Sequence, residues 1–221
     1  MAQVAVIDLL NVVAQICREC PTPVLIDAYV SAVRKFCSTS RWLKNTIPGS
    51  TAIGYELYSL GSDTYNEIIG IQAMSIQETV GDIHPLTDSN STKWDRNDAQ
   101  DVPEFYQYVP EGQFAVHPIP DAVYPLTVSV VLQPKNGVNS IDASLVVKWD
   151  ICFQAGALEY LLKLPRMPWT DKAEALVQGR IFDGMCYQGL GNAERGYNAG
   201  AAHTGKSGGS SGAVRTSMLP I

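Results

Sequence analysis

The hydrophobic periodicity of this chain changes twice along its 221 residues, and this change limits the folds that the chain can adopt. Residues 1–46 repeat apolar side chains at helical spacing, residues 47–136 alternate apolar with polar side chains, and residues 137–188 return to helical spacing. The sequence therefore predicts an α+β fold. In this fold, N- and C-terminal helices pack as one helical body, and a small antiparallel β-domain is inserted between them.

The helical segments carry start signals and apolar stripes. Thr22 followed by Pro23 predicts the start of a helix, because threonine caps helices and proline is tolerated in the first turn. Residues 144–164 are apolar almost all round, which predicts a helix buried between partners. Thr170 predicts the start of a last helix, which glycines from position 184 onward are expected to weaken. The residues expected to be buried on this last helix are Ala173, Leu176, Val177, Ile181 and Met185.

The middle region combines strand signals with most of the negative charge. Phe105–Val109 and Gln113–His117 flank Pro110-Glu111-Gly112, which predicts a β-hairpin. Residues 82–121 contain eight acids and two bases, and this difference equals the net charge of −6 of the whole chain. We expect an exposed acidic surface here. Its candidate residues are Asp95, Asp98, Asp101 and Glu104.

Gly200 to Ser207 matches the nucleotide-binding pattern G-x-x-x-x-G-K-[ST]. A phosphate-binding loop of this kind follows a strand and precedes a helix, so that backbone N–H groups converge on the phosphates. Here a helical segment precedes the motif and a Gly/Ser-rich stretch follows it. A P-loop nucleotide hydrolase is therefore the least favoured alternative, and no cofactor is expected.

Two other motifs favour a structural interpretation. Cys17 and Cys20 have redox or zinc spacing, but no second cysteine pair follows at zinc-finger spacing, so buried thiols are favoured. Asp95, Asp98 and Asp101 recur every three residues and can gather a cation, but the calcium-loop pattern is absent. No Gly-x-Ser-x-Gly motif is present, and His84 and His117 are distinguished only by the prolines that follow them. We therefore expect neither catalytic residues nor a metal site.

Basic residues cluster near the end of the second predicted helix, at Arg34, Lys35, Arg41 and Lys44. Such a cluster can contact DNA or a protein partner, although a solvated helix face is the commoner interpretation. The sequence contains neither a signal peptide nor a membrane-spanning apolar run, so assembly in the cytoplasm is expected.

Residues 189–221 are rich in Gly, Ser and Ala, which predicts a flexible arm that becomes ordered on a partner. The end of this arm combines a cation with apolar side chains, a composition suited to anchoring. The candidate partner-binding residues are Lys206, Arg215, Met218, Leu219 and Ile221.

Several short motifs also occur in a defined order along the chain. They are Phe36-Cys37-x-x-Ser40-x-Trp42, Tyr55-x-Leu57-Tyr58-x-Leu60, His117-Pro118-x-Pro120, Trp149 with Gly156-Ala157, and Pro168-Trp169. Followed by a flexible arm, this order resembles the head-to-tail connector proteins, or portal adaptors, of tailed bacteriophages.

The resemblance implies a non-enzymatic virion protein at the head–tail junction. Twelve copies would form a ring beneath the portal protein, and double-stranded DNA would pass through its channel without sequence-specific binding. The C-terminal arm would grip the portal, and the β-domain would face outward or toward a downstream tail protein. The acidic surface would face either DNA or a basic neighbour. A virion DNA-binding or tail-tube component is the alternative.

Overall fold

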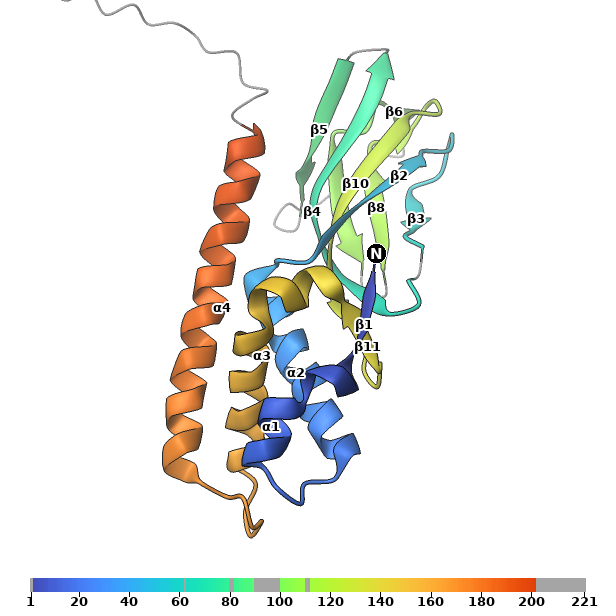
Figure 1. The fold of residues 1–221 in the computed structure, drawn as a ribbon. Helices are drawn as coiled ribbons and strands as arrows, with labels where there is room; N and C mark the ends of the chain where they lie inside the picture. Colours follow the sequence, from blue (N-terminus) through green and yellow to red (C-terminus); the bar gives the residue numbers. More distant parts are fainter. Residues whose placement is uncertain (1, 62, 80–81, 90–99, 110–111, 202–221) are drawn as a thin grey trace, which may run out of the picture.

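The computed structural model describes residues 2–61, 63–79, 82–89, 100–109 and 112–201. Figure 1 shows short N-terminal helices grouped with two longer ones at one end of the molecule and a curled sheet at the other. A long C-terminal helix runs beside them. The buried apolar residues of the helices and the sheet form one continuous core.

The N-terminal region contains shorter elements than the sequence predicts. Strand β1 (Gln3–Ala5) is followed by a 3-10 helix η1 (Val6–Leu9), α1 (Asn11–Ile16) and α2 (Thr22–Ser40). Strand β1 pairs antiparallel with β11 (Ser140–Asp142), which joins the two chain segments that flank the sheet. The buried apolar residues of this region are Val6, Leu10, Val13 and Cys17, whereas Ile16 is exposed.

The main sheet contains seven strands. Its order is β2-β10-β4-β5-β7-β8-β3; β5 and β7 are parallel, and all other neighbours are antiparallel. The strands are β2 (Lys44–Ser50), β3 (Leu57–Ser59), β4 (Asn66–Thr79), β5 (Asp82–Asp88), β7 (Phe105–Val109), β8 (Gln113–His117) and β10 (Pro125–Pro134). A further parallel pair joins β6 (Gln100–Asp101) to β9 (Ile119–Pro120).

This sheet shows that the predicted fold class, a helical body with a small antiparallel insert, is wrong. Among the described residues the molecule is rich in β-structure, with a curled, mixed, seven-stranded sheet beside four α-helices. The register between β10 and β4 shifts between Ser129 and Val130 and between Val131 and Leu132. Such irregularities bend a strand and increase its twist, so a long sheet can curl around its own apolar face. The predicted hairpin of β7 and β8 is confirmed.

The remaining helices are α3 (Ala143–Leu162) and α4 (Lys172–Ala201), which pack together and against α2. Aromatic rings fill the space between α2 and α3: the Phe36 centroid lies 4.9 Å from Trp149 and 5.3 Å from Phe153. Asp142 begins α3 by accepting a 2.8 Å hydrogen bond from the Ser144 backbone N–H. None of the helices in the described ranges is both long and apolar enough to cross a membrane.

Helix α4 buries a different face from the one the sequence predicts. Of the predicted residues, Ala173, Leu176, Val177 and Ile181 are exposed, and Met185 is partly buried against the core. The buried positions follow an alternating spacing of four and three residues and are mostly small: Ala175, Gly179, Phe182, Cys186, Gly189 and Ala193. A methyl group on Gly189 would lie 2.9 Å from the Phe36 ring, so this glycine allows α4 to approach α2 closely. Residues 189–201, expected to begin the flexible arm, continue this helix.

Candidate interaction surfaces

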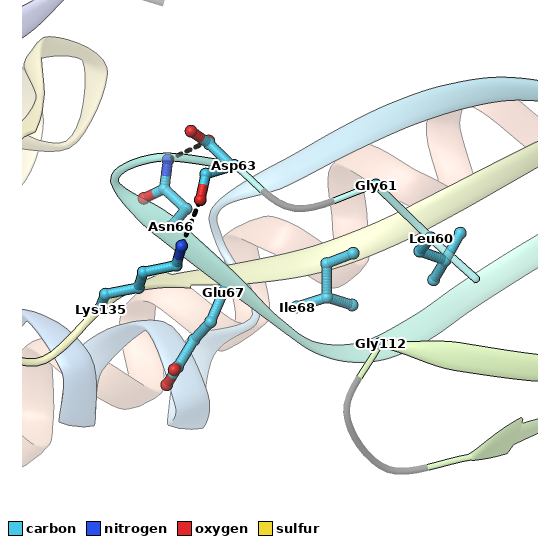
Figure 2. A pocket seen from close by; sticks show the side chains of 8 residues that line it. All are labelled: Leu60, Gly61, Asp63, Asn66, Glu67, Ile68, Gly112 and Lys135. Atoms are coloured by element: carbon cyan, nitrogen blue, oxygen red, sulfur yellow. Dashed lines mark hydrogen bonds between the residues drawn. The ribbon is translucent and has the colours of Figure 1, made fainter.

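A cavity of about 340 Å³ lies where the loop before β4 meets the ends of β8 and β10 (Figure 2). Asn66 Nδ2 donates a 2.7 Å hydrogen bond to Asp63 Oδ2, and the Tyr65 backbone N–H donates to Asp63 Oδ1 at 3.1 Å. The Lys135 ammonium donates to the Asp63 carbonyl oxygen. Glu67, on the same wall, pairs with Arg34 of α2 at 2.8 Å.

The contacts of Asp63 hold the loop before β4 to the end of β10, and the Glu67–Arg34 pair joins β4 to α2. Burial alone would raise the pKa of Asp63, but the hydrogen bonds from Asn66 and from the Tyr65 and Thr64 backbone, with the charge of Lys135, outweigh burial and lower it. Asp63 therefore stays ionised within its hydrogen bonds to Asn66 and the neighbouring backbone. We interpret the cavity as a structural feature of the sheet, because its polar groups are used in contacts within the chain.

The four predicted basic residues make different contacts. Arg34 pairs with Glu67, and Lys35 lies 3.3 Å from Asp183 and 4.8 Å from the centroid of the Phe182 ring. Arg41 ends α2 in the left-handed conformation, with φ of 51°. Burial, with the nearby charge of Arg41, lowers the pKa of Lys44, whose ammonium lies 3.4 Å from the carbonyl oxygen of residue 193. Their role in DNA or partner contact stays a prediction.

The predicted acidic surface is only partly described. Asp101 lies exposed in β6, and Glu104 is exposed beside a second cavity of about 430 Å³ that Glu78 and His84 also border. Asp95 and Asp98 lie outside the described residues. The negative charge seen here therefore includes Glu78, which was not among the sequence candidates.

The five cysteines are free thiols, and all but Cys20 are buried. The expected burial is therefore confirmed for Cys17, whereas Cys20 is only partly buried. Burial raises the pKa of Cys17 to about 11, with a further contribution from Cys20, and raises that of Cys37 to about 12. Thiols with such pKa values remain protonated near neutral pH, so they make poor nucleophiles.

The predicted partner-binding residues of the arm, Lys206, Arg215, Met218, Leu219 and Ile221, lie outside the described residues. The first residues of the P-loop-like segment, Gly200 and Ala201, belong to α4. A helix therefore leads into this segment, whereas a phosphate-binding loop requires a strand at that place.

Exposed apolar residues on α3 and α4 were not recognised from the sequence. Val147 and Ile151 lie four residues apart on α3 and are 89% and 69% exposed, and we call them the α3 face. Leu176, Val177 and Ile181 form the α4 face, on which Leu176 is 61% exposed. Apolar side chains gathered on a helix surface are typical of protein–protein contacts.

The comparison with protein-family models decides the identity of the chain. Residues 3–204 match the model of the SU10 adaptor protein, a range that includes the sheet, the helices and both exposed faces. The chain belongs to the SU10 adaptor protein family. No curated protein sequence matches it.

Membership of the SU10 adaptor family makes this chain a phage structural protein associated with the virion, whose partners are other head and tail proteins. The resemblance to phage adaptors is confirmed at this level. For an adaptor, surfaces that bind other proteins are the functional sites, and the α3 and α4 faces are candidates for such surfaces.

Proposed function

We propose that this SU10 adaptor forms a ring, of twelve copies, that joins the portal of the phage head to the tail and surrounds the passage for double-stranded DNA. The protein acts by assembly and performs no catalysis. The observation that carries the proposal is the pair of exposed apolar helix faces, because a cyclic ring requires each subunit to use two different surfaces.

In this ring, the α4 face of one subunit packs on the α3 face of the next. Both faces present branched aliphatic side chains, Val147 and Ile151 on α3 and Leu176, Val177 and Ile181 on α4. Transfer of apolar surface out of water favours association at about 25 cal/mol for each Å² buried. The contact is heterologous, so it does not form a two-fold dimer, and it gives a ring when the rotation from one subunit to the next closes.

The excess of acidic residues between positions 82 and 121 suits the sheet to face either DNA or a basic partner protein in the ring. Negative side chains such as Asp101 and Glu104 repel DNA phosphates, which would let DNA pass without sticking. The same charge suits a basic surface on a downstream tail protein.

The segment after α4 supplies the contact with the portal, through Lys206, Arg215, Met218, Leu219 and Ile221. In sequence it combines Gly and Ser with a terminal group of apolar and basic residues, a pattern that suits a segment folding on its partner. The competing DNA-binding function is less well supported, because Arg34 and Lys35 already lie beside carboxylates of this chain.

The test is co-assembly of the full chain with the portal protein, followed by native mass spectrometry. Deletion of residues 204–221 should leave the circular dichroism spectrum and the melting temperature unchanged but abolish the complex with the portal. Full-length protein carrying Ser210→Ala and Ser211→Ala is the control and should bind normally. Normal binding by the truncated protein would contradict the proposed role of the arm.

A further inference from the structure

Three potential metal ligands meet on the sheet, away from both helix faces. Glu78 lies near the end of β4, and Asp82 and His84 lie at the start of β5, its antiparallel neighbour. Their potential ligand atoms all lie within 4.8 Å of one another. All three side chains are exposed, so an ion could reach them from solvent.

The strand register explains why these side chains converge. Gln77 pairs with Ile83 and Thr79 pairs with Asp82, so Glu78 is the extra residue of a β-bulge. Bulges re-aim side chains. His84 pairs with the buried Ile76, and Leu86 pairs with the buried Met74. The triad therefore lies where the buried apolar residues of β4 and β5 end.

The distances between these ligand atoms, although within ion-pair range, also suit a bound ion. His84 Nε2 lies 3.3 Å from Asp82 Oδ1 and 3.5 Å from Glu78 Oε2. A charge-assisted hydrogen bond of this kind is shorter, about 2.7–2.9 Å. Zinc bonds of about 2.0–2.1 Å in a tetrahedron separate neighbouring ligand atoms by about 3.3–3.4 Å. The two distances therefore correspond to edges of a zinc coordination tetrahedron.

The ligand types select the class of ion. Calcium takes about six to eight oxygen ligands, and magnesium keeps an octahedral shell of oxygen, whereas this triad offers one imidazole and two carboxylates. Imidazole with carboxylates suits zinc, which accepts three protein ligands and leaves a fourth position for water or another ligand. The positive charge of the ion would also offset the repulsion between the carboxylates of Glu78 and Asp82. Glu104, at the adjoining cavity, adds a further negative charge to this repulsion.

We propose that Glu78, Asp82 and His84 form a zinc-binding site that ties β4 to β5 at the exposed end of the sheet. The site supplies three protein ligands from two strands, so zinc binding stabilises this end of the sheet. It is independent of the helix faces and of the arm, and its test does not depend on ring assembly.

The experiment is isothermal titration of ZnCl₂ into untagged full-length protein in buffer containing a non-thiol, non-chelating reductant. Each of the variants Glu78→Gln, Asp82→Asn and His84→Ala removes one ligand from an exposed side chain, and circular dichroism checks their folding. Glu104→Gln is the matched control, because it removes a negative charge beside the same cavity without removing a ligand.

We expect wild-type protein and Glu104→Gln to bind one zinc ion at this site, and each ligand variant to bind it at least about tenfold more weakly. Zinc should raise the melting temperature of wild-type protein and leave that of His84→Ala unchanged. The proposal is overturned if His84→Ala binds zinc as tightly as wild type, if Glu104→Gln weakens binding as much as the ligand variants do, or if wild-type protein binds none.

Discussion

Asp63 shows at the scale of one residue how the loop before β4 is held to the end of β10. Its carboxylate accepts hydrogen bonds from Asn66 and from the Tyr65 backbone, and its carbonyl oxygen accepts one from Lys135. Glu67, next to Asn66 on the same strand, reaches Arg34 on α2. In the sequence these residues look like ordinary polar surface residues. Their contacts could not be predicted, because only folding brings positions 63 and 135 together.

The lowered pKa of Asp63 predicts a contribution to stability that depends on pH. Because the folded-state pKa lies below the unfolded-state value, this contribution is complete above the unfolded pKa of about 3.9 and is lost as the pH falls through the folded pKa. Asp63→Asn should therefore destabilise the protein near pH 7, and the difference from wild type should shrink in acid.

Urea denaturation of monomeric protein between neutral and acidic pH measures this difference. Asp27→Asn, which removes an exposed charge from α2, is the control for the loss of one negative charge. A stability difference between Asp63→Asn and wild type that stays constant down to the lowest pH would contradict the role assigned to the Asp63 carboxylate.

At the scale of elements, the sequence predicts most helices and strands but not which faces they bury. The start of α2 at Thr22 and the hairpin of β7 and β8 agree with the structure. The expected helix over residues 144–164 is present as α3, but it is not buried all round, because Val147 and Ile151 are exposed. On α4, the large aliphatic residues Leu176, Val177 and Ile181 were expected on the buried face, but they are exposed. The buried face consists mainly of alanine, glycine and cysteine, which give a weak hydrophobic signal but permit close helix packing.

Glycines of α4 therefore have different roles, and a matched pair of substitutions tests them. Gly189→Ala places a methyl group 2.9 Å from the Phe36 ring and 3.0 Å from Ser40 Cβ, so it should destabilise the protein by about 1–3 kcal/mol. Gly184→Ala has no neighbouring atom within 4 Å and should stabilise the helix by up to about 1 kcal/mol.

Urea denaturation monitored by circular dichroism, at concentrations where the chain is monomeric, compares the two variants. Equal effects of Gly189→Ala and Gly184→Ala would mean that the close contact between α4 and α2 does not determine the stability of this helix. The proposed reason for the small residues along the buried face would then be wrong.

At the scale of the whole molecule, local patterns could not reveal the size of the sheet. Alternation identifies the faces of strands but not their partners, and the parallel pairing of β5 with β7 joins strands separated by residues 89–104. The register shifts between β4 and β10 depend on tertiary packing. The phage-adaptor family could be inferred from motif order, whereas the exposed helix faces and the Glu78–Asp82–His84 triad required the folded chain.

The central claim is a ring in which the α4 face of each subunit binds the α3 face of the next. Substitutions on the two faces test this claim directly. Val147→Asp places a charge on the α3 face, and Ile181→Asp places one on the α4 face. Each variant alone should remain monomeric, because every contact in the ring uses both faces. Val123→Asp, which alters an exposed apolar residue beside the sheet, should assemble like wild type.

The most direct test is native mass spectrometry of an equimolar mixture of Val147→Asp and Ile181→Asp. The intact α4 face of Val147→Asp can bind the intact α3 face of Ile181→Asp. The α3 face of Val147→Asp and the α4 face of Ile181→Asp are both blocked by the new charge. The proposed ring therefore predicts that the mixture forms heterodimers and stops there, whereas wild-type protein forms a closed ring. A mixture that stays monomeric, or either variant assembling alone as wild type does, would contradict this arrangement.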